Sequence, residues 1–211
     1  MTAQPKTFIP EDVYLERELH STTKHEYCAG EVYAMAGASE QHNLIAMNIA
    51  AQLHMQLRGG GCRTYPSDMR VKVMKTGLNT YPDFTIVCGQ SLFTSMSKRD
   101  TLINPTVIIE ILSPSTERYD RGMKFQHYRT IETLQEYLLI AQEKHHIERF
   151  IRQSSQEWVF SEAIGCDSSM AIPSIHGILE LREVYERVVF LPEVVPHSTR
   201  DLPADEDNSA G

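Results

Sequence analysis

The segment Thr106–Leu112 (TVIIEIL) constrains the fold more than any other part of the chain. Its nearly continuous apolar residues are typical of a central β-strand that is covered on both faces. Glu110 interrupts this run, and an unpaired charge there would cost on the order of several kcal/mol. A metal ion, a basic side chain or hydrogen-bond donors must therefore accompany Glu110. A buried ion pair with an arginine is the purely structural alternative to a functional site.

The hydrophobic periodicity around this strand predicts an α/β (α+β) fold, a mixed sheet flanked by helices. Ser39 is a suitable N-cap for a long helix from Glu40 to Leu57, which three glycines end. A period of two marks a half-exposed strand over 69–74. The other expected elements are a helix from Pro10, a hairpin over 27–35 turning at Gly30, strands over 83–88, 106–112, 137–141, 147–153 and 157–164, a polar loop over 89–104, a helix from about 116 to 130 and a short helix over 179–187.

The length and composition predict one soluble domain. We expect residues 1–192 to form it and the acidic, polar residues 193–211 to be a disordered tail. The N-terminus lacks a secretory signal, and no apolar run reaches the roughly 20 residues of a membrane span, so we expect a cytoplasmic protein. A net charge of −8 argues against a protein that coats nucleic acid by bulk electrostatics, although clustered metal-binding carboxylates would contribute to that charge.

The cysteines and paired histidines predict no metal or disulfide chemistry. The four cysteines are scattered without a CxxC pair, so we expect four reduced, mostly buried thiols. His145 and His146 flank an expected strand turn with no cysteine or carboxylate at ligand spacing, which argues against a zinc site.

Asp83 is the second carboxylate of interest. It follows Pro82 at the start of the strand that precedes the one carrying Glu110. Two carboxylates on neighbouring strands repel each other unless a cation lies between them. Oxygen ligands of this kind suit hard ions, so the pair predicts a site for Mg²⁺ or Mn²⁺.

Pro82-Asp83 together with Glu110-Ile111-Leu112 resembles the signature of the PD-(D/E)XK nucleases. Leu112 stands where that signature has a lysine, which positions or activates the attacking water. Lys124 on the following helix is a candidate replacement, because some members of the superfamily carry the lysine there. A solvated helix lysine is the alternative interpretation of Lys124.

Several spaced motifs, from about residue 10 to 190, resemble in order the cyanobacterial-type restriction-endonuclease domain family of this superfamily. They are Lys24–Tyr27, Gly30-Glu31, Met35–Ser39, His42, Ser67–Arg70, Glu110–Thr116, Asp120–Lys124, Tyr128 and Glu136-Tyr137.

The resemblance implies a nuclease-like fold, a Mg²⁺-type site and DNA as substrate. It implies that Asp83, Glu110 and the Ile111 carbonyl hold the metal and that Lys124 orients water or phosphate.

Further residues are weighed around this site. Glu26 and His42 lie at matching positions of the family pattern, but Glu26 can equally pair with a basic residue of its hairpin and His42 can be a capping group. Asp68 either joins the acidic cluster or closes a turn. The basic residues nearest the site in sequence, which we expect to meet the substrate, are Lys98, Arg99, Arg118 and Arg121.

Three functions compete at this point. The leading hypothesis is a metal-dependent endonuclease-like phosphodiesterase that acts on DNA. Leu112 favours the alternative, a catalytically inactive nuclease fold that binds nucleic acid or another partner. A hydrolase of small phosphoesters would fit the acidic net charge. The sequence does not define the oligomeric state, and a homodimer is one of the alternatives.

Overall fold

The computed structural model describes residues 8–95, 98 and 100–190. The expected tail, residues 193–211, lies entirely outside these residues. Along the chain the elements are α1 (Glu11–His20), β1 (His25–Cys28), β2 (Glu31–Ala34), α2 (Glu40–Leu57), β3 (Cys62–Pro66), β4 (Arg70–Val73), β5 (Leu78–Thr80), β6 (Phe84–Cys88), β7 (Thr101–Leu102), β8 (Val107–Leu112), α3 (Glu117–Tyr119), a π-helical turn (Asp120–Lys124), α4 (Phe125–Tyr128), β9 (Glu136–Ala141), β10 (His146–Arg152), β11 (Trp158–Ile164), β12 (Ser169–Ile172), a 3-10 turn (Pro173–Ile175), β13 (Gly177–Glu180) and α5 (Leu181–Val184).

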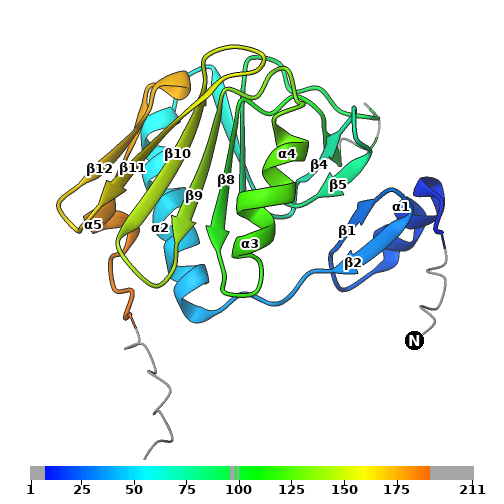
Figure 1. The fold of residues 1–211 in the computed structure, drawn as a ribbon, viewed down its shortest axis with the longest axis horizontal. Helices are drawn as coiled ribbons and strands as arrows, with labels where there is room; N and C mark the ends of the chain where they lie inside the picture. The colour runs from blue at the N-terminus through cyan, green and yellow to red at the C-terminus, as the bar shows by residue number, and fades with distance from the viewer. Residues whose placement is uncertain (1–7, 96–97, 99, 191–211) are drawn as a thin grey trace, which may run out of the picture.

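A six-stranded mixed sheet, which we call the main sheet, forms the centre of the fold. Its strand order is β11-β10-β9-β8-β6-β3, with β8 parallel to β9 and every other pair antiparallel. Helix α2 lies against one face and the segment α3–α4 lies against the other (Figure 1). The α/β (α+β) architecture expected from the sequence, a mixed sheet flanked by helices, is confirmed.

A second sheet, the small sheet, has the order β2-β1-β5-β4-β7 and lies toward the N-terminal end of the fold together with α1 (Figure 1). The hairpin β1–β2 turns at Ala29 and Gly30, where both residues have positive φ, which glycine adopts without steric cost. The predicted hairpin is therefore confirmed, and it supplies one edge of the small sheet.

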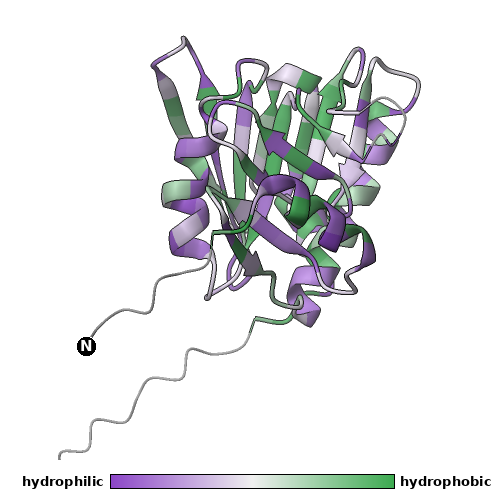
Figure 2. Ribbon diagram, turned by 90° about the vertical axis from the view of Figure 1, so that its right-hand side faces the viewer, coloured by the Kyte–Doolittle hydropathy of each residue, from purple (hydrophilic) through white to green (hydrophobic). Residues whose placement is uncertain are grey.

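The two faces of the main sheet are packed by separate apolar clusters, and β8 contributes to both. Val107, Ile109 and Ile111 face α2, whereas Ile108 and Leu112 face α4 and the small sheet. All six residues of β8 are buried, as expected for a central strand. Figure 2 shows green, hydrophobic segments along the strands, and both purple and green segments on the helices around them. Because side chains alternate along a strand, Glu110 points to the α4 face between Ile108 and Leu112.

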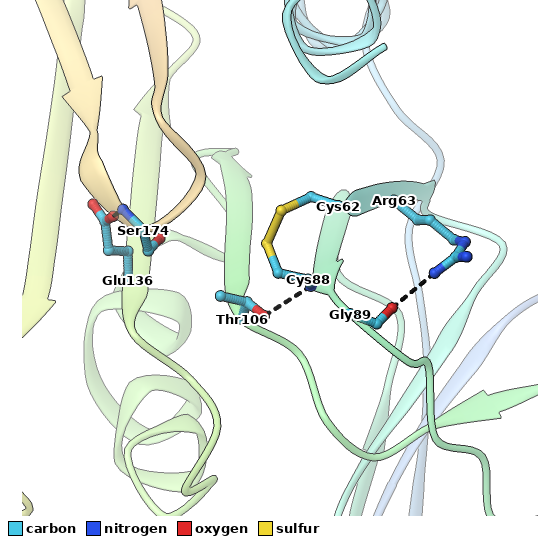
Figure 3. The surroundings of a disulfide bond; sticks show 7 residues. All are labelled: Cys62, Arg63, Cys88, Gly89, Thr106, Glu136 and Ser174. Carbon is cyan, nitrogen blue, oxygen red and sulfur yellow. Dashed lines mark hydrogen bonds between the residues drawn. A yellow bond between two sulfur atoms is a disulfide. The ribbon is translucent and has the colours of Figure 1, made fainter. Parts of the chain in front are cut away.

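The prediction of four reduced thiols is wrong for one pair. Cys62 and Cys88 lie directly opposite each other on β3 and β6 and form a disulfide (Figure 3). Their 26-residue separation gave no sign of this contact, because β3 itself was not predicted from the sequence. Cys28 and Cys166 are free and partly buried.

Other differences concern short elements. β3, β5, β12 and β13 were not expected, and the loop expected over 89–104 contains β7 and a bridge between Phe93 and Leu102. The helix predicted over 179–187 is four residues long, and the residues just before it belong to β13. In these short strands, unlike in β4, no alternation of apolar and polar residues marked the element.

Two further observations complete the fold. The helix predicted after residue 116 is present, but its middle is the π-helical turn Asp120–Lys124. No helix of the described residues is long and apolar enough to cross a membrane.

Candidate functional site

Asp83 lies beside the strand that carries Glu110. β6 pairs with β8 so that Phe84 lies opposite Ile109, which confirms that the two strands are neighbours. The backbone N–H of Ile111 donates to Asp83 Oδ2 over 2.7 Å. The Asp83 carboxylate is therefore fixed next to the residue that follows Glu110, and its side chain keeps 16% exposure.

His42 reaches the same carboxylate from the first turn of α2. The Ser39 side chain caps this helix by accepting from the backbone N–H of His42. This leaves the imidazole free to point at Asp83, and His42 Nε2 lies 3.1 Å from Asp83 Oδ1. His42 thus contributes its backbone to the cap and its ring to the site.

Lys124 lies at the centre of a buried cluster of carboxylates. Its Nζ is 3.0 Å from Glu26 Oε1, 3.1 Å from Glu110 Oε1 and 3.2 Å from Asp120 Oδ1. The Lys124 side chain is only 5% exposed, so the interpretation as a solvated helix lysine is wrong. The position expected for Lys124, over Glu110, is confirmed. π-Helical turns are rare in proteins, and those that occur often lie at functional sites. In this turn both Asp120 and Lys124 are buried.

Three parts of the fold meet at Lys124. Glu110 comes from the main sheet, Asp120 and Lys124 from the helical segment, and Glu26 from β1 of the small sheet. Neutral hydroxyl groups complete the cluster: Tyr128 donates to Glu110 Oε1 over 2.8 Å, and Thr80 donates to Glu26. The small sheet therefore closes the site and supplies one of its carboxylates.

The electrostatics of the cluster follow from burial and from the unequal number of charges. Burial, reinforced by Asp120 and Asp83 and opposed by Lys124, raises the pKa of Glu110 from 4.5 to about 8. Burial also raises the pKa of Asp120, against the effect of Lys124.

Burial alone would lower the pKa of Lys124, but Glu110, Glu26 and Asp120 outweigh it and raise that pKa well above its ordinary value. With three carboxylates around one ammonium, Lys124 keeps its charge even when one carboxyl group holds a proton.

The carboxylates in and beside the Lys124 cluster outnumber its cationic group. Asp83, Glu110, Glu26 and Asp120 carry four formal negative charges against the single positive charge of Lys124, an excess of three. Proteins compensate such an excess with protons or with a cation, and carboxylate and carbonyl oxygens are the ligands of Mg²⁺ and Mn²⁺.

The remaining residues singled out from the sequence lie apart from this cluster. Asp68 is 87% exposed in the turn after β3 and pairs with Lys24 at 2.7 Å, which agrees with the turn-closing interpretation. Arg121 pairs with Glu117 at 2.8 Å and with Glu148, so its guanidinium is held by carboxylates.

Lys98 and Arg118, the other basic residues that the structure describes, show no contact with the cluster. Lys98 is exposed and lines a cavity of about 270 Å³ together with Arg70 and Asp100, next to α1. Arg118 is exposed on α3. Arg99 lies outside the described residues.

Sequence reasoning missed three members of the cluster as site residues, namely Asp120, Tyr128 and Thr80. The spacing of four between Asp120 and Lys124 was the available signal, because residues four apart on a helix are neighbours. Thr80 had no such signal, since it belongs to a three-residue strand.

The argument against ligands around His146 is also wrong. Its ring lies beside Glu148, two residues along β10, and Glu162, on the neighbouring strand β11. Glu148 was visible in the sequence at the i+2 position, where side chains share a face of a strand. Glu162 became a neighbour only through strand pairing.

Comparisons with known proteins agree with this fold. Residues 11–178 match the family model Uma2, described as "Putative restriction endonuclease". Two proteins of Synechocystis sp. (strain PCC 6803), both named as uncharacterized, are similar. The protein sll1609 is 35% identical over 152 residues, which is 72% of this chain and 85% of that protein. The protein slr1290 is 33% identical over 150 residues, 71% of this chain and 77% of that protein.

A solved structure has a similar fold. It is the crystal structure of "a putative nuclease belonging to DUF820" from Anabaena variabilis, with a TM-score of 0.67 over 83% of this chain and 98% of that one. The identity between the two sequences is 16%, so the similarity concerns the fold.

Proposed function

The chain belongs to the Uma2 family, and from this membership and the site geometry we propose that it hydrolyses phosphodiester bonds of DNA with a divalent metal ion. Mg²⁺ or Mn²⁺ is the proposed ion, and the cytoplasm, where DNA is accessible, is the proposed location. The observation that carries the proposal is the position of Lys124 Nζ, 3.1 Å from Glu110 Oε1. Lys124 thus places an ammonium beside Glu110. On the strand of Glu110, Leu112 occupies the position at which the PD-(D/E)XK signature has its lysine.

Asp83, Glu110 and the main-chain carbonyl of Ile111 would hold the ion. A bound Mg²⁺ or Mn²⁺ lowers the pKa of a water molecule and shields the negative charge of the phosphate. The hydrogen bond from Ile111 N–H and the contact with His42 fix both oxygens of Asp83, so this carboxylate is oriented in advance. Tyr128 orients Glu110 in the same way.

Lys124 acts in this proposal as a charged group that positions water or a phosphate oxygen. Its raised pKa keeps the proton on Nζ at neutral pH, so it is an ammonium donor and no general base. The carboxylates around it fix the ammonium in place, which limits its side-chain freedom before the substrate arrives.

One observation favours a second function, a nuclease fold that binds nucleic acid without cutting it. The Lys124 ammonium already has three carboxylate partners and is almost completely buried, so contact with phosphate requires it to exchange a partner. Because residue 112 is a leucine, β8 has no lysine that could contact the phosphate in place of Lys124.

The test is DNA cleavage by purified protein with Mg²⁺ or Mn²⁺, compared with Asp83→Asn. Asparagine keeps the size of the side chain and an oxygen to accept from Ile111 N–H, but it removes the charge that holds the cation. We expect cleavage to fall at least about 100-fold, since a metal supplies several kcal/mol and about 1.4 kcal/mol corresponds to a factor of ten. Asp167→Asn makes the same change at an exposed position and should leave cleavage unaltered.

DNA binding, measured separately by fluorescence anisotropy, separates the alternatives. Asp83→Asn should bind DNA at least as well as the parent protein, because one charge that repels phosphate is gone. Binding without metal-dependent cleavage in the parent would establish the inactive module instead. Poor DNA binding together with turnover of a small phosphoester would establish a hydrolase of small substrates. Undiminished cleavage by Asp83→Asn would show that the site is wrongly assigned.

A further inference from the structure

A second group of ligand-type side chains lies on β10 and β11, where β11 is an edge strand of the main sheet. His146 and Glu148 are two residues apart on β10 and therefore share a face. Glu162 lies directly opposite Glu148 in the antiparallel register. Like charges directly opposite each other destabilise a strand pair, so a positive charge between the two carboxylates would stabilise this arrangement.

The distances within the group fit a single ion. His146 Nε2 lies 3.0 Å from Glu162 Oε2 and 3.6 Å from Glu148 Oε1, and one ligand atom of each residue lies within 4.8 Å of the other two. Ligands about 2.1 Å from one ion stand roughly 3.0–3.4 Å apart in octahedral or tetrahedral geometry. Only small side-chain rotations separate the three atoms from such an arrangement.

Two of the three side chains are fixed and the third is open to solvent. The side chains of His146 and Glu148 are 9% and 10% exposed, whereas that of Glu162 is 44% exposed. The backbone of His146 is held at both ends by the Tyr185 hydroxyl, which accepts from His146 N–H over 3.2 Å and donates to His146 O over 2.8 Å. The buried pair can thus define the site while the exposed carboxylate gives an ion access and leaves room for water.

The nearby arginine leaves the group with negative charge. Arg121 binds Glu148 through Oε2, whereas Glu148 Oε1 is the oxygen that faces His146. Glu117 pairs with the same guanidinium and offsets its charge. The carboxylates of Glu117, Glu148 and Glu162 therefore exceed the one arginine by two charges when His146 is neutral.

We propose that His146, Glu148 and Glu162 form a binding site for a divalent transition-metal ion of the Zn²⁺ class, separate from the Asp83–Glu110 site. An imidazole nitrogen with two carboxylates suits Zn²⁺ better than Mg²⁺, which prefers oxygen ligands alone. Three protein ligands and an open fourth position accommodate tetrahedral coordination with one water. The ion fastens the edge strand β11 to β10 and, through Glu148 and Arg121, to the π-helical turn that carries Lys124. This proposal does not depend on the proposed nuclease activity.

The test is calorimetric titration of Zn²⁺ into full-length protein that carries Asp83→Asn, after removal of any histidine tag, so that the nuclease metal site does not contribute. We expect one Zn²⁺ per chain. Glu162→Gln should weaken the affinity at least about tenfold, because it removes the charge of one ligand. Its matched control, Glu157→Gln, changes an exposed residue outside the group and should bind as before.

A second readout identifies the nitrogen ligand. Co²⁺ in the same protein should give visible absorption bands, and His146→Gln should abolish them while the far-ultraviolet circular dichroism of the metal-free variant stays that of a folded protein. Absence of Zn²⁺ binding by the Asp83→Asn protein would overturn the proposal, as would equal affinity in Glu162→Gln. In that case the contact between Arg121 and Glu148 offsets part of the negative charge of the group without an ion.

Discussion

The two faces of β8 belong to the same strand but are stabilised in different ways. On the face toward α2, Val107, Ile109 and Ile111 pack into an apolar cluster that needs no electrostatic compensation. On the face toward α4, Glu110 stands between Ile108 and Leu112 and is compensated by Lys124 and Tyr128. Burial of apolar side chains on the first face stabilises the folded state. On the second face, buried charges cost free energy and remain only because they have partners. The contrast locates the site, because violations of the apolar pattern are expected where function requires them.

The largest expected effect separates the charged face from an ordinary salt bridge. Lys124→Met removes the ammonium that contacts Glu26, Glu110 and Asp120 and leaves their charges uncompensated in a buried position. We expect a loss of about 3–5 kcal/mol in the free energy of unfolding, measured by urea denaturation. Lys144→Met, at an exposed position, should change it by less than about 0.5 kcal/mol.

A loss as small in Lys124→Met as in Lys144→Met would mean that the cluster readily takes up protons or water. The two faces of β8 would then differ less than the burial indicates.

The next effect concerns the apolar face, against which Cys62 and Cys88 pack. Replacing both by serine removes a cross-link that closes a loop of 26 residues, so we expect the free energy of unfolding to fall by about 3 kcal/mol. Cys166→Ser, at a free cysteine, is the control. DNA cleavage per folded molecule should stay unchanged, because Cys88 lies at the opposite end of β6 from Asp83. A loss of cleavage in the folded double variant would show that the candidate site depends on the packing of the apolar face.

The redox state of this pair also tests the proposed location. Disulfides are rare in cytosolic proteins, so in a cytoplasmic protein the two thiols are expected to be reduced. Alkylation of freshly lysed cells before purification, followed by mass spectrometry, counts the free thiols. Four alkylated cysteines would agree with the cytoplasm, and two with an oxidising compartment.

The smallest effect is a change in pH dependence. The fold raises the pKa of Glu110 from 4.5 to about 8, so between these values the folded protein holds a proton that the unfolded chain has released. The contribution of Glu110 to stability is therefore largest below about pH 4.5 and is lost as pH rises toward about 8. Glu110→Gln, which cannot titrate, should lose less stability than the parent between pH 5 and 8.

Urea denaturation at several pH values measures this difference, with Glu143→Gln, at an exposed position, as the control that keeps the parent slope. Mg²⁺ should reduce the parent slope as well, because the ion favours the charged carboxylate. Equal slopes in the parent and Glu110→Gln would mean that Glu110 is ionised throughout this range.

The sequence predicted the parts of the fold whose pattern is long and local. Helix α2 was predicted with its boundaries because Ser39, an apolar helical period and three glycines mark it within the chain itself. Strand β8 stood out because the segment Thr106–Leu112 is nearly continuously apolar. The short strands β3 and β5 could not be recognised, since each pairs with a strand that is distant in sequence, β3 with β6 and β5 with β1.

The candidate site followed the same rule. Glu110 was recognised from its immediate neighbours, and Lys124 from a helix that starts a few residues later. The sequence left undecided whether Glu26 joins the site, because no local pattern shows which element a hairpin packs against. The pairing of Glu148 with Glu162 depends on the register of β10 and β11, which the sequence alone does not define.

The most direct test of the central claim is a crystal structure of the protein soaked in Mn²⁺, with anomalous scattering measured at the manganese edge. The account predicts an anomalous peak within about 2.3 Å of carboxylate oxygens of both Asp83 and Glu110 and of the Ile111 carbonyl oxygen. Lys124 Nζ should remain beside Glu110. An Asp83–Glu110 site without manganese, at a concentration that supports DNA cleavage, would contradict the account.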